Sequence, residues 1–306
     1  MKKILLASTA LVAMSVSAAH ADLSISGSYE FGYIQQNTSG TNLTTSDGNI
    51  TFKSTSTADN GITYGVVGNY GIQNMGVEDV YLQMDGDFGT LILGETDSML
   101  DRNDGALGKS QFSWGNFTTP ETAINMGSGN EDTAAIHFQS NELAAGLKVY
   151  GTVIPDAKSG FGVTYTNDLA TITYQSAGGG GTDETMVAAG INVAGFGLNA
   201  GSKNSTTGGT KTTSSDFAVS YSVNGVTLTG GSLKTGTNDF KMIGAAYSIA
   251  PGVGLVVESF EEEGTTNEKG ELIKFANPKT LREHFFNNLA DQAELAYNDP
   301  QLTKAG

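Results

Sequence analysis

Acidic side chains gather in residues 96–132, the longest stretch of the chain without strand-like patterning. Its carboxylates are Asp97, Asp101, Asp104, Glu121, Glu131 and Asp132, and its only basic residues are Arg102 and Lys109. Carboxylates at this density can attract cations, transfer protons or bind a metal ion. They can equally belong to a solvated loop in which acids are simply common, so both interpretations stay open for each residue.

Motifs that would assign catalysis to these side chains are absent. Neither G-x-S-x-G nor H-E-x-x-H occurs in the chain. The segment Gly105–Ser110 resembles a phosphate-binding loop, but Asn103 stands where that motif needs its first glycine. The pair Glu131-Asp132 is too loose a pattern to predict a calcium site. We therefore expect no enzyme activity, no cofactor and no metal site.

The charge and the N-terminal residues restrict the partners and the compartment. The net charge is −16, which argues against nucleic acid as a partner because phosphate binding needs clustered Lys and Arg. Lys2 and Lys3 precede an apolar stretch that ends in Ala19-His20-Ala21, so residues 1–21 are predicted to be a signal peptide and Asp22 the mature start. An uncleaved anchor is the alternative. The chain has no cysteines, so no disulfides support the secreted fold.

Alternation of apolar with small or polar residues dominates the chain from Leu23 to Phe260 and predicts β-strands. No later segment approaches the roughly 20 consecutive apolar residues of a membrane helix. Most predicted strands are close to the roughly 9–11 residues that cross a bilayer in a barrel. Fifteen strands are expected near residues 23–35, 48–57, 61–72, 77–85, 88–95, 133–140, 145–153, 159–166, 169–176, 184–193, 196–203, 215–223, 226–233, 238–249 and 253–260.

The connections alternate between short and long. Tight turns such as Asn224-Gly225 alternate with longer polar links at 36–47, 96–132, 154–158, 177–183, 204–214 and 261–270, and with brief links at 73–76 and 234–237. Outer-membrane barrels have short turns on one side and longer loops on the other. We therefore predict an all-β, transmembrane antiparallel barrel whose longest link, 96–132, folds into the lumen, since so long a loop is usually functional.

Strand parity assigns three lysines to the lumen. Phe52 is expected to face lipid, so its neighbour Lys53 points inward. The same argument applies to Lys148 and Lys241, each of which stands between two apolar residues, and the neighbours of His137 place its side chain inside as well. A lysine on the lipid face costs about 2–4 kcal/mol at the midplane. These lysines are expected to form a basic pore wall opposite the acidic link, at a height that parity does not fix.

One segment resembles a known family. Phe88-Gly89-Thr90-Leu91-Ile92-Leu93-Gly94-Glu95-Thr96-Asp97 is similar to the strand-and-loop motif of alphaproteobacterial porins of the Rhodobacter type. The leader Met1–Ala10, the opening Leu23–Gly27 and the segment Ala250–Leu255 look like that family too, so the resemblance covers about residues 1–270. It implies a general diffusion porin with a barrel of about 16 strands, a homotrimer, and a third loop that narrows the pore.

The C-terminal end departs from that family, whose chains close with a strand that ends in an aromatic residue. Here Glu271–Phe275 is a candidate closing strand, and Asn277-Pro278 then reads as a helix start. Apolar residues at helical spacing follow until Pro300. We expect a barrel over residues 22–276 and a short helical tail over 277–306, whose truncation after Phe275 leaves the barrel intact.

Two function classes stay open. The first is a water-filled channel in the outer membrane of a Gram-negative bacterium, in contact with outer-membrane lipid and conducting small hydrophilic solutes and ions. Its acidic excess predicts weak cation selectivity. The second is a secreted surface adhesin or structural β-protein, and an outer-membrane hydrolase is disfavoured for lack of a catalytic triad. A lipid-facing apolar stripe on every strand separates the channel from an adhesin, which would bury its apolar residues.

Overall fold

The computed structural model describes residues 22–36, 42–73, 76–103, 134–155, 157–251, 253–263 and 269–276. These residues form antiparallel strands and one short helix, α2. The strands are β1 (Asp22–Gln36), β2 (Asn42–Thr57), β3 (Thr63–Gly71), β4 (Val77–Gly86), β5 (Gly89–Glu95), β6 (Ala135–Gln139), β7 (Leu147–Val153), β8 (Ser159–Thr166), β9 (Ala170–Gly179), β10 (Thr182–Val193), β11 (Phe196–Thr207), β12 (Thr210–Val223), β13 (Val226–Thr235), β14 (Asn238–Ala250), β15 (Val253–Glu263) and β16 (Lys269–Ala276). The helix α2 (Met99–Arg102) follows β5.

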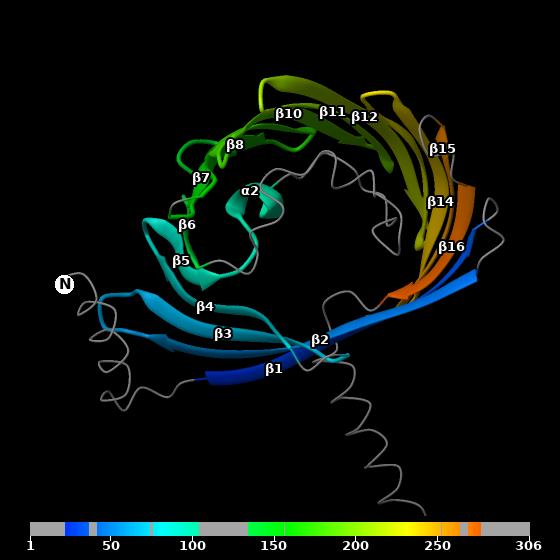
Figure 1. The fold of residues 1–306 in the computed structure, drawn as a ribbon. Helices are drawn as coiled ribbons and strands as arrows, with labels where there is room; N and C mark the ends of the chain where they lie inside the picture. The colour runs from blue at the N-terminus through cyan, green and yellow to red at the C-terminus, as the bar shows by residue number, and fades with distance from the viewer. Residues whose placement is uncertain are drawn as a thin grey trace, which may run out of the picture.

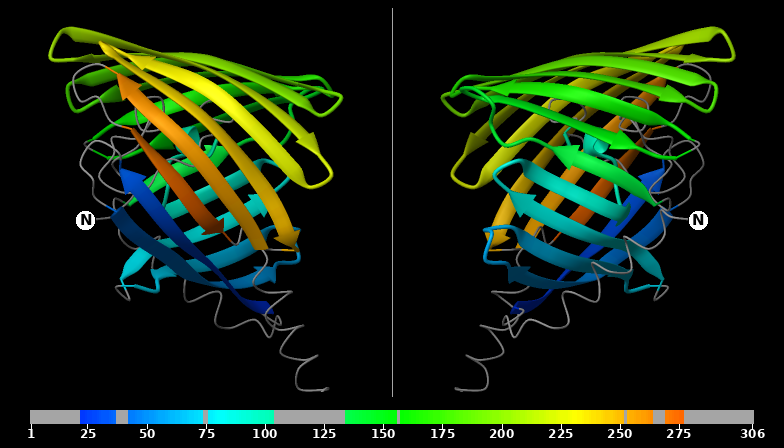
Figure 2. Two further views of the ribbon diagram at one scale, coloured as in Figure 1. Left: turned by 90° about the vertical axis from the view of Figure 1, so that its right-hand side faces the viewer. Right: turned by 90° about the vertical axis from the view of Figure 1, so that its left-hand side faces the viewer.

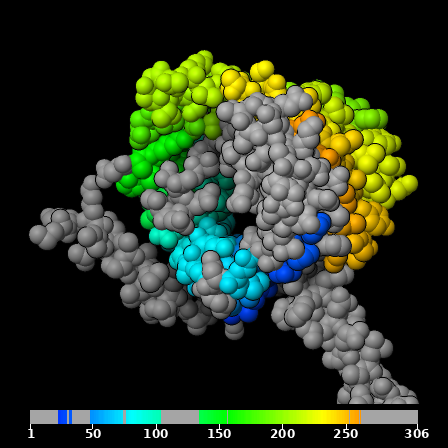
Figure 3. All heavy atoms as spheres, turned by 45° about the vertical axis from the view of Figure 1, so that its right-hand side comes forward, coloured from blue at the N-terminus to red at the C-terminus, as the bar shows by residue number. Residues whose placement is uncertain are grey.

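The strands close into a barrel. Each strand pairs with its sequence neighbours, and β1 pairs with β16, where Phe31 lies opposite Phe275 (Figure 1). In the space-filling view the atoms of the strands form a ring (Figure 3). Closure pairs residues 30–36 of the first strand with the last strand, which shortens the unpaired sheet edge and stabilises a sheet without disulfides. The predicted barrel of about 16 strands is confirmed, and the candidate closing strand at Glu271–Phe275 lies within β16.

The two faces of the barrel wall differ in polarity. Large apolar side chains stand exposed on the outer face, among them Phe161, Ile172, Val187, Phe217, Leu228 and Ile243. The alternate positions face inward and include Thr173 and Gln175, which are fully buried. The stripe expected of a membrane barrel, and not of an adhesin, is therefore present. No helix among the described residues is long and apolar enough to cross a membrane.

Several links that were predicted to be long are strands. The link expected at 177–183 is a two-residue turn at Gly180-Gly181, and the one expected at 204–214 is a turn at Gly208-Gly209. Both glycines of each pair have positive φ, as tight hairpin turns require. The strands β10 to β12 are correspondingly long, and their hairpins project beyond the neighbouring strands (Figure 2). The predicted contrast between short and long connections was therefore wrong at these two links.

The predicted signal peptide, residues 1–21, and the predicted helical tail, residues 277–306, lie outside the described residues. The same holds for residues 104–133 of the long third loop. The part of that loop that the structure describes, Thr96–Asn103, lies inside the ring of strands, where α2 contacts β6, β7 and β8 (Figure 1). The expectation that this loop folds into the lumen is confirmed for these residues.

Candidate functional site in the lumen

The third loop enters the lumen through α2. Ser98 caps the helix, since its Oγ accepts a hydrogen bond of 3.1 Å from the backbone N–H of Asp101. Met99 and Leu100 are buried and belong to one apolar cluster with Tyr150 and Met186 of the barrel wall. The apolar face of a single helical turn therefore attaches the beginning of the loop to the inner wall.

Buried hydrogen bonds fix this attachment. The Thr152 hydroxyl accepts from the backbone N–H of Met99 at 2.8 Å and lies 3.0 Å from Nδ1 of His137. Gln175 Nε2 donates to the Leu100 carbonyl at 2.7 Å and to the Tyr150 hydroxyl at 3.0 Å. We call His137, Tyr150, Thr152 and Gln175 the anchor network. Each of these four side chains is at most 3% exposed, so its polar contacts form away from solvent, where they hold one arrangement.

The end of the helix is tied to the wall as well. Asn103 Nδ2 donates to the Met99 carbonyl at 2.8 Å and to Gln139 Oε1 of β6 at 3.0 Å. The Arg102 guanidinium donates to the Thr96 hydroxyl and lies 5.6 Å from the ring centroid of Tyr81 on β4. The loop entry is therefore held on both sides, by β4 and by β6 to β9.

Two of the six predicted acidic site residues are described. Asp97 is half-buried, and that burial raises the pKa of its carboxyl above the usual value of 3.8. The nearby Asp79 carboxylate raises the pKa further, while Arg102 lowers it. Asp101 lies in the first turn of α2. The other four, Asp104, Glu121, Glu131 and Asp132, lie outside the described residues. No group of His, Asp and Glu in the described ranges is arranged to hold a metal ion.

Two of the three predicted wall lysines face the lumen. Lys53 on β2 lies opposite Val67, which is buried on the inner face of β3. Lys148 on β7 lies opposite Thr164, whose hydroxyl donates to the inward-facing Tyr150 hydroxyl at 3.3 Å. Paired residues of an antiparallel sheet share a face, so both lysines point inward. Whether either one lies at the narrowest point of the pore stays a prediction.

The inward assignment of Lys241 was wrong. Its neighbour Phe240 faces inward, opposite the buried Leu233, and packs against the apolar cluster of the lumen. Ile243, two residues beyond Lys241 on the same face of β14, is 69% exposed on the outside. The flanking apolar residues therefore line the inner wall instead of contacting lipid, and Lys241 points outward.

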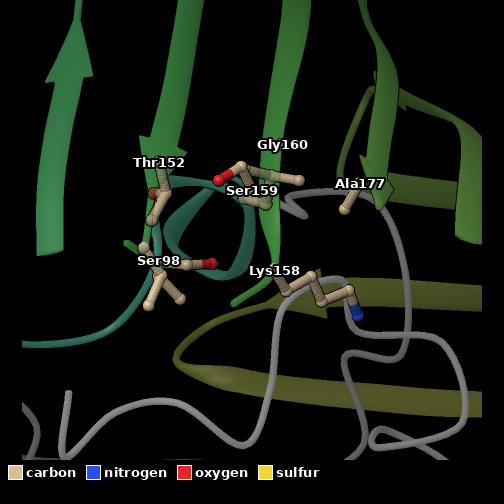
Figure 4. A pocket seen from close by; sticks show the side chains of 8 residues that line it. Ser98, Thr152, Lys158, Ser159, Gly160 and Ala177 are labelled. Atoms are coloured by element: carbon tan, nitrogen blue, oxygen red, sulfur yellow. The ribbon is translucent and has the colours of Figure 1, made fainter. Parts of the chain in front are cut away.

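The sequence interpretation missed a basic cluster on the inner wall. Glu184 of β10 forms ion pairs with Lys158 and, at 2.9 Å, with Lys203 of β11. Parity in β11 was sufficient to place Lys203 inside, because Leu198 and Ala200 alternate with it on the outer face. Lys158 could not be found in this way, because it precedes β8 in a predicted link. Lys158 also lines a cavity with Ser98 and Thr152 (Figure 4); its volume of about 10 Å³ holds at most one water molecule.

Comparison with known proteins identifies this arrangement. A family model described as Gram-negative porin matches residues 7–270. The chain belongs to this family. It is a β-barrel porin of the Gram-negative outer membrane, and its family is one of channels and not of enzymes. No curated protein sequence matches the porin.

Solved porin structures share the fold at low identity. A mutant of the Rh. blastica porin is 15% identical with a TM-score of 0.64, and the match covers 84% of this chain and 99% of that one. Salmonella typhi OmpF, in complex with daunomycin, is 11% identical with a TM-score of 0.72 over 84% and 97%. A loop-deletion mutant of Vibrio cholerae OmpT is 12% identical with a TM-score of 0.68 over 84% and 99%. These likenesses show the barrel and leave selectivity to this chain's own side chains.

Proposed function

We propose that this porin is a passive, water-filled pore for small hydrophilic solutes and ions. The observation that carries the proposal is the anchored entry of the third loop, which brings charged side chains of residues 97–102 into the lumen. Small and hydroxyl-bearing residues dominate the inner positions of the strands, such as Ser26, Thr51 and Gly65. A polar lining of this kind favours hydrated solutes over apolar ones.

We further propose weak cation selectivity. The inward-facing carboxylates of the described residues are Glu78, Asp79, Asp85, Asp97, Asp101, Glu184, Asp216 and Glu258. They outnumber the inward-facing cations Lys53, Arg102, Lys148, Lys158 and Lys203. Because Lys241 faces outward, it does not oppose the acids of the loop. The small negative excess supports a preference for cations that declines as salt screens the charges.

Planar-bilayer recording of the purified porin tests both parts of the proposal. Stepwise, ohmic conductance is expected for a passive pore, and in a salt gradient the reversal potential is expected on the cation side. The preference should decline at high salt, because the Debye screening length shortens to about 3 Å at 1 M. A folded preparation that never conducts contradicts the pore, whereas an anion-side reversal potential at low salt contradicts only the selectivity.

We also propose that the porin is a homotrimer of the alphaproteobacterial type. The support is the resemblance of Phe88–Asp97, which forms β5 and the first residues of the third loop, to that group of porins. A folded barrel trimer changes its migration in detergent gels when it is boiled. Cross-linking of the unboiled band should therefore yield three chains, and a band of one chain contradicts the trimer.

A further inference from the structure

Outward-facing lysines gather on three neighbouring strands. Among the lysines whose side chains the structure describes, Lys211, Lys234 and Lys241 face outward, from β12, β13 and β14 respectively. All three lie towards the end of the barrel where the third loop begins, the end expected to face outside. On these strands the described outward-facing side chains include one carboxylate, Asp239, in a chain whose net charge is −16. The clustering therefore runs against the composition of the chain.

The height of Lys241 places it near the outer edge of the apolar belt. On β14 the outward positions from Ile249 through Tyr247 to Ile243 are exposed and apolar. Eight residue steps separate Ile249 from Lys241, which is about 27 Å along the strand and about 19 Å along the membrane normal at a tilt of 45°. The apolar band of such barrels is about 25 Å tall, so a lysine side chain here reaches the headgroup layer.

A hollow lies beside these lysines. Its volume is about 360 Å³, and its outward-facing lining residues are Ser215, Phe217, Ser232, Lys234, Asp239 and Lys241. The other lining residues, Asp216, Leu233 and Phe240, are their inward-facing neighbours on the same strands. Lys241 lies opposite Ser232, and Ser232 lies opposite Phe217, so ammonium, hydroxyl and aromatic groups follow one another across three strands.

Carboxylates beside the hollow are compatible with an anionic ligand. Asp239 is 3.5 Å from Lys234, and both side chains are well exposed, at 46% and 63%. Glu261 of β15 is the register partner of Lys241. An ammonium group has three N–H donors, so an ion pair with one carboxylate leaves donors that can contact a phosphate. An exposed pair of this kind also contributes little energy, which makes it easy to rearrange.

We propose that this hollow binds the phosphate headgroup of an anionic outer-leaflet lipid. Lys234 and Lys241 donate to the phosphate oxygens, the hydroxyl of Ser232 donates alongside them, and an acyl chain lies against Phe217 and Ile243. Height and donor chemistry select this occupant, because phosphate headgroups are the anions found at the edge of the apolar belt and each lysine keeps N–H donors beyond its carboxylate partner. The site depends on the membrane location of the porin and not on its ion selectivity.

Native mass spectrometry of the full chain tests the site. The porin, released from a neutral detergent that contains equal amounts of phosphatidylglycerol and phosphatidylcholine, should retain phosphatidylglycerol selectively. The double variant Lys234→Ala/Lys241→Ala should lose about tenfold in that retention, since two charge-assisted hydrogen bonds disappear. The matched control Lys53→Ala/Lys148→Ala removes the same charge from the inner wall and should retain the lipid.

Each other outcome overturns the proposal. Equal loss in both double variants would mean that overall charge, and not this hollow, attracts the lipid. Displacement of phosphatidylglycerol by an equal concentration of inorganic phosphate would mean a site for free phosphate. If the double variant does not fold, Lys241→Gln alone, which keeps the pair of Lys234 with Asp239, must reduce retention. Channel conductance, measured on the same samples, stays unchanged in the outer-face variants, so failure here is separate from failure of the pore.

Discussion

Gln175 is a buried side chain that helps to hold the described entry of the third loop. It is fully buried, and its Nε2 donates both to the Leu100 carbonyl of α2 and to the Tyr150 hydroxyl of the wall. Gln175→Leu keeps the volume but leaves both acceptors without this donor, at a cost of about 1–3 kcal/mol. We expect a lower unfolding temperature and a noisier open-channel current, measured by heat-modifiable gel migration and in planar bilayers.

Gln83→Leu is the matched control for that change. Gln83 is an amide on the same inner surface, but its Nε2 donates to Asp85 on its own strand at 2.7 Å and not to the loop. This variant should therefore keep the quiet current of the parent. A Gln175→Leu channel with parental noise and unfolding temperature would show that the apolar contacts of Met99 and Leu100 are sufficient to hold α2.

Asp97 should make the proposed cation preference depend on pH. Burial first, and then the Asp79 carboxylate, raises the pKa of Asp97 above the usual 3.8. A raised pKa means that the neutral form is already populated at a pH where an ordinary aspartate is still charged. As the pH falls, the cation preference should therefore begin to decline at a pH above 3.8, the usual pKa of an aspartate. Reversal potentials recorded at constant salt over a range of pH measure this decline.

The Asp97→Asn variant removes this group and should flatten the early part of the decline. Asp85→Asn, at the other end of β4, also removes one inward carboxylate but should leave the early decline in place. If both variants respond to pH in the same way, the desolvated position of Asp97 has no influence on conduction.

At the scale of elements, β16 sets the limit of a viable truncation. The strand runs from Lys269 to Ala276 and pairs with both β1 and β15, so it closes the barrel. A stop after Ala276 keeps every pair of this strand, while a stop before Lys269 exposes the edges of β1 and β15. The first truncation should retain the heat-modifiable band and the second should lose it. Loss of the band in the first would mean that residues 277–306 are needed for assembly.

The strands could be predicted from the sequence because their signal is local. Alternation at period two appears in stretches such as Ile62–Ile72 without any knowledge of the partner strand. The polar stretches at 177–183 and 204–214 predict loops by their composition, because Gly, Ser, Thr and Asn dominate them. Hairpins that project beyond the lipid contact water on both faces, so their sequences show no alternation of apolar with polar residues. Their backbones nevertheless pair fully.

The site could be predicted only in part, because the orientation of a side chain also depends on what it packs against inside the lumen. Lys53 follows the simple rule that apolar neighbours face lipid, but Lys241 violates it, since Phe240 packs on the apolar cluster inside the lumen. The anchor network joins His137, Thr152 and Gln175, which are far apart in sequence and carry no motif. The pairing of four strands, β6 to β9, brings these residues together, and no single segment of the sequence encodes that.

At the scale of the whole molecule, the charges of the lumen are divided between two sides. Asp79 of β4 lies near the half-buried Asp97, and Asp85 lies at the other end of that strand, whereas Glu184 of β10 pairs with Lys203 of β11 and with Lys158, which directly precedes β8. In the ring, the strands β5 to β9 separate β4, at the lower left, from β10, at the top (Figure 1). Because Glu184 offsets one of its two lysines, this group opposes the acids of the loop entry with less positive charge than its lysines alone suggest.

The selectivity of the porin should therefore respond to the loop more than to any other acidic group. The triple variant Asp97→Asn/Asp101→Asn/Asp104→Asn removes the two described carboxylates of the loop entry together with Asp104, the next acidic residue of the third loop in the sequence. A unit charge about 8 Å from a passing ion in water changes its energy by about 0.5 kcal/mol, so each removal changes the permeability to either ion by about twofold, in opposite directions for cations and anions. The reversal potential at low salt should move towards anions.

The matched triple Asp59→Asn/Asp87→Asn/Asp168→Asn removes the same charge from turns at the other end of the barrel and should change the reversal potential less. Equal shifts in the two triples would assign the preference to the overall charge of the barrel, and no shift in the first would show that the third loop is not the selectivity element.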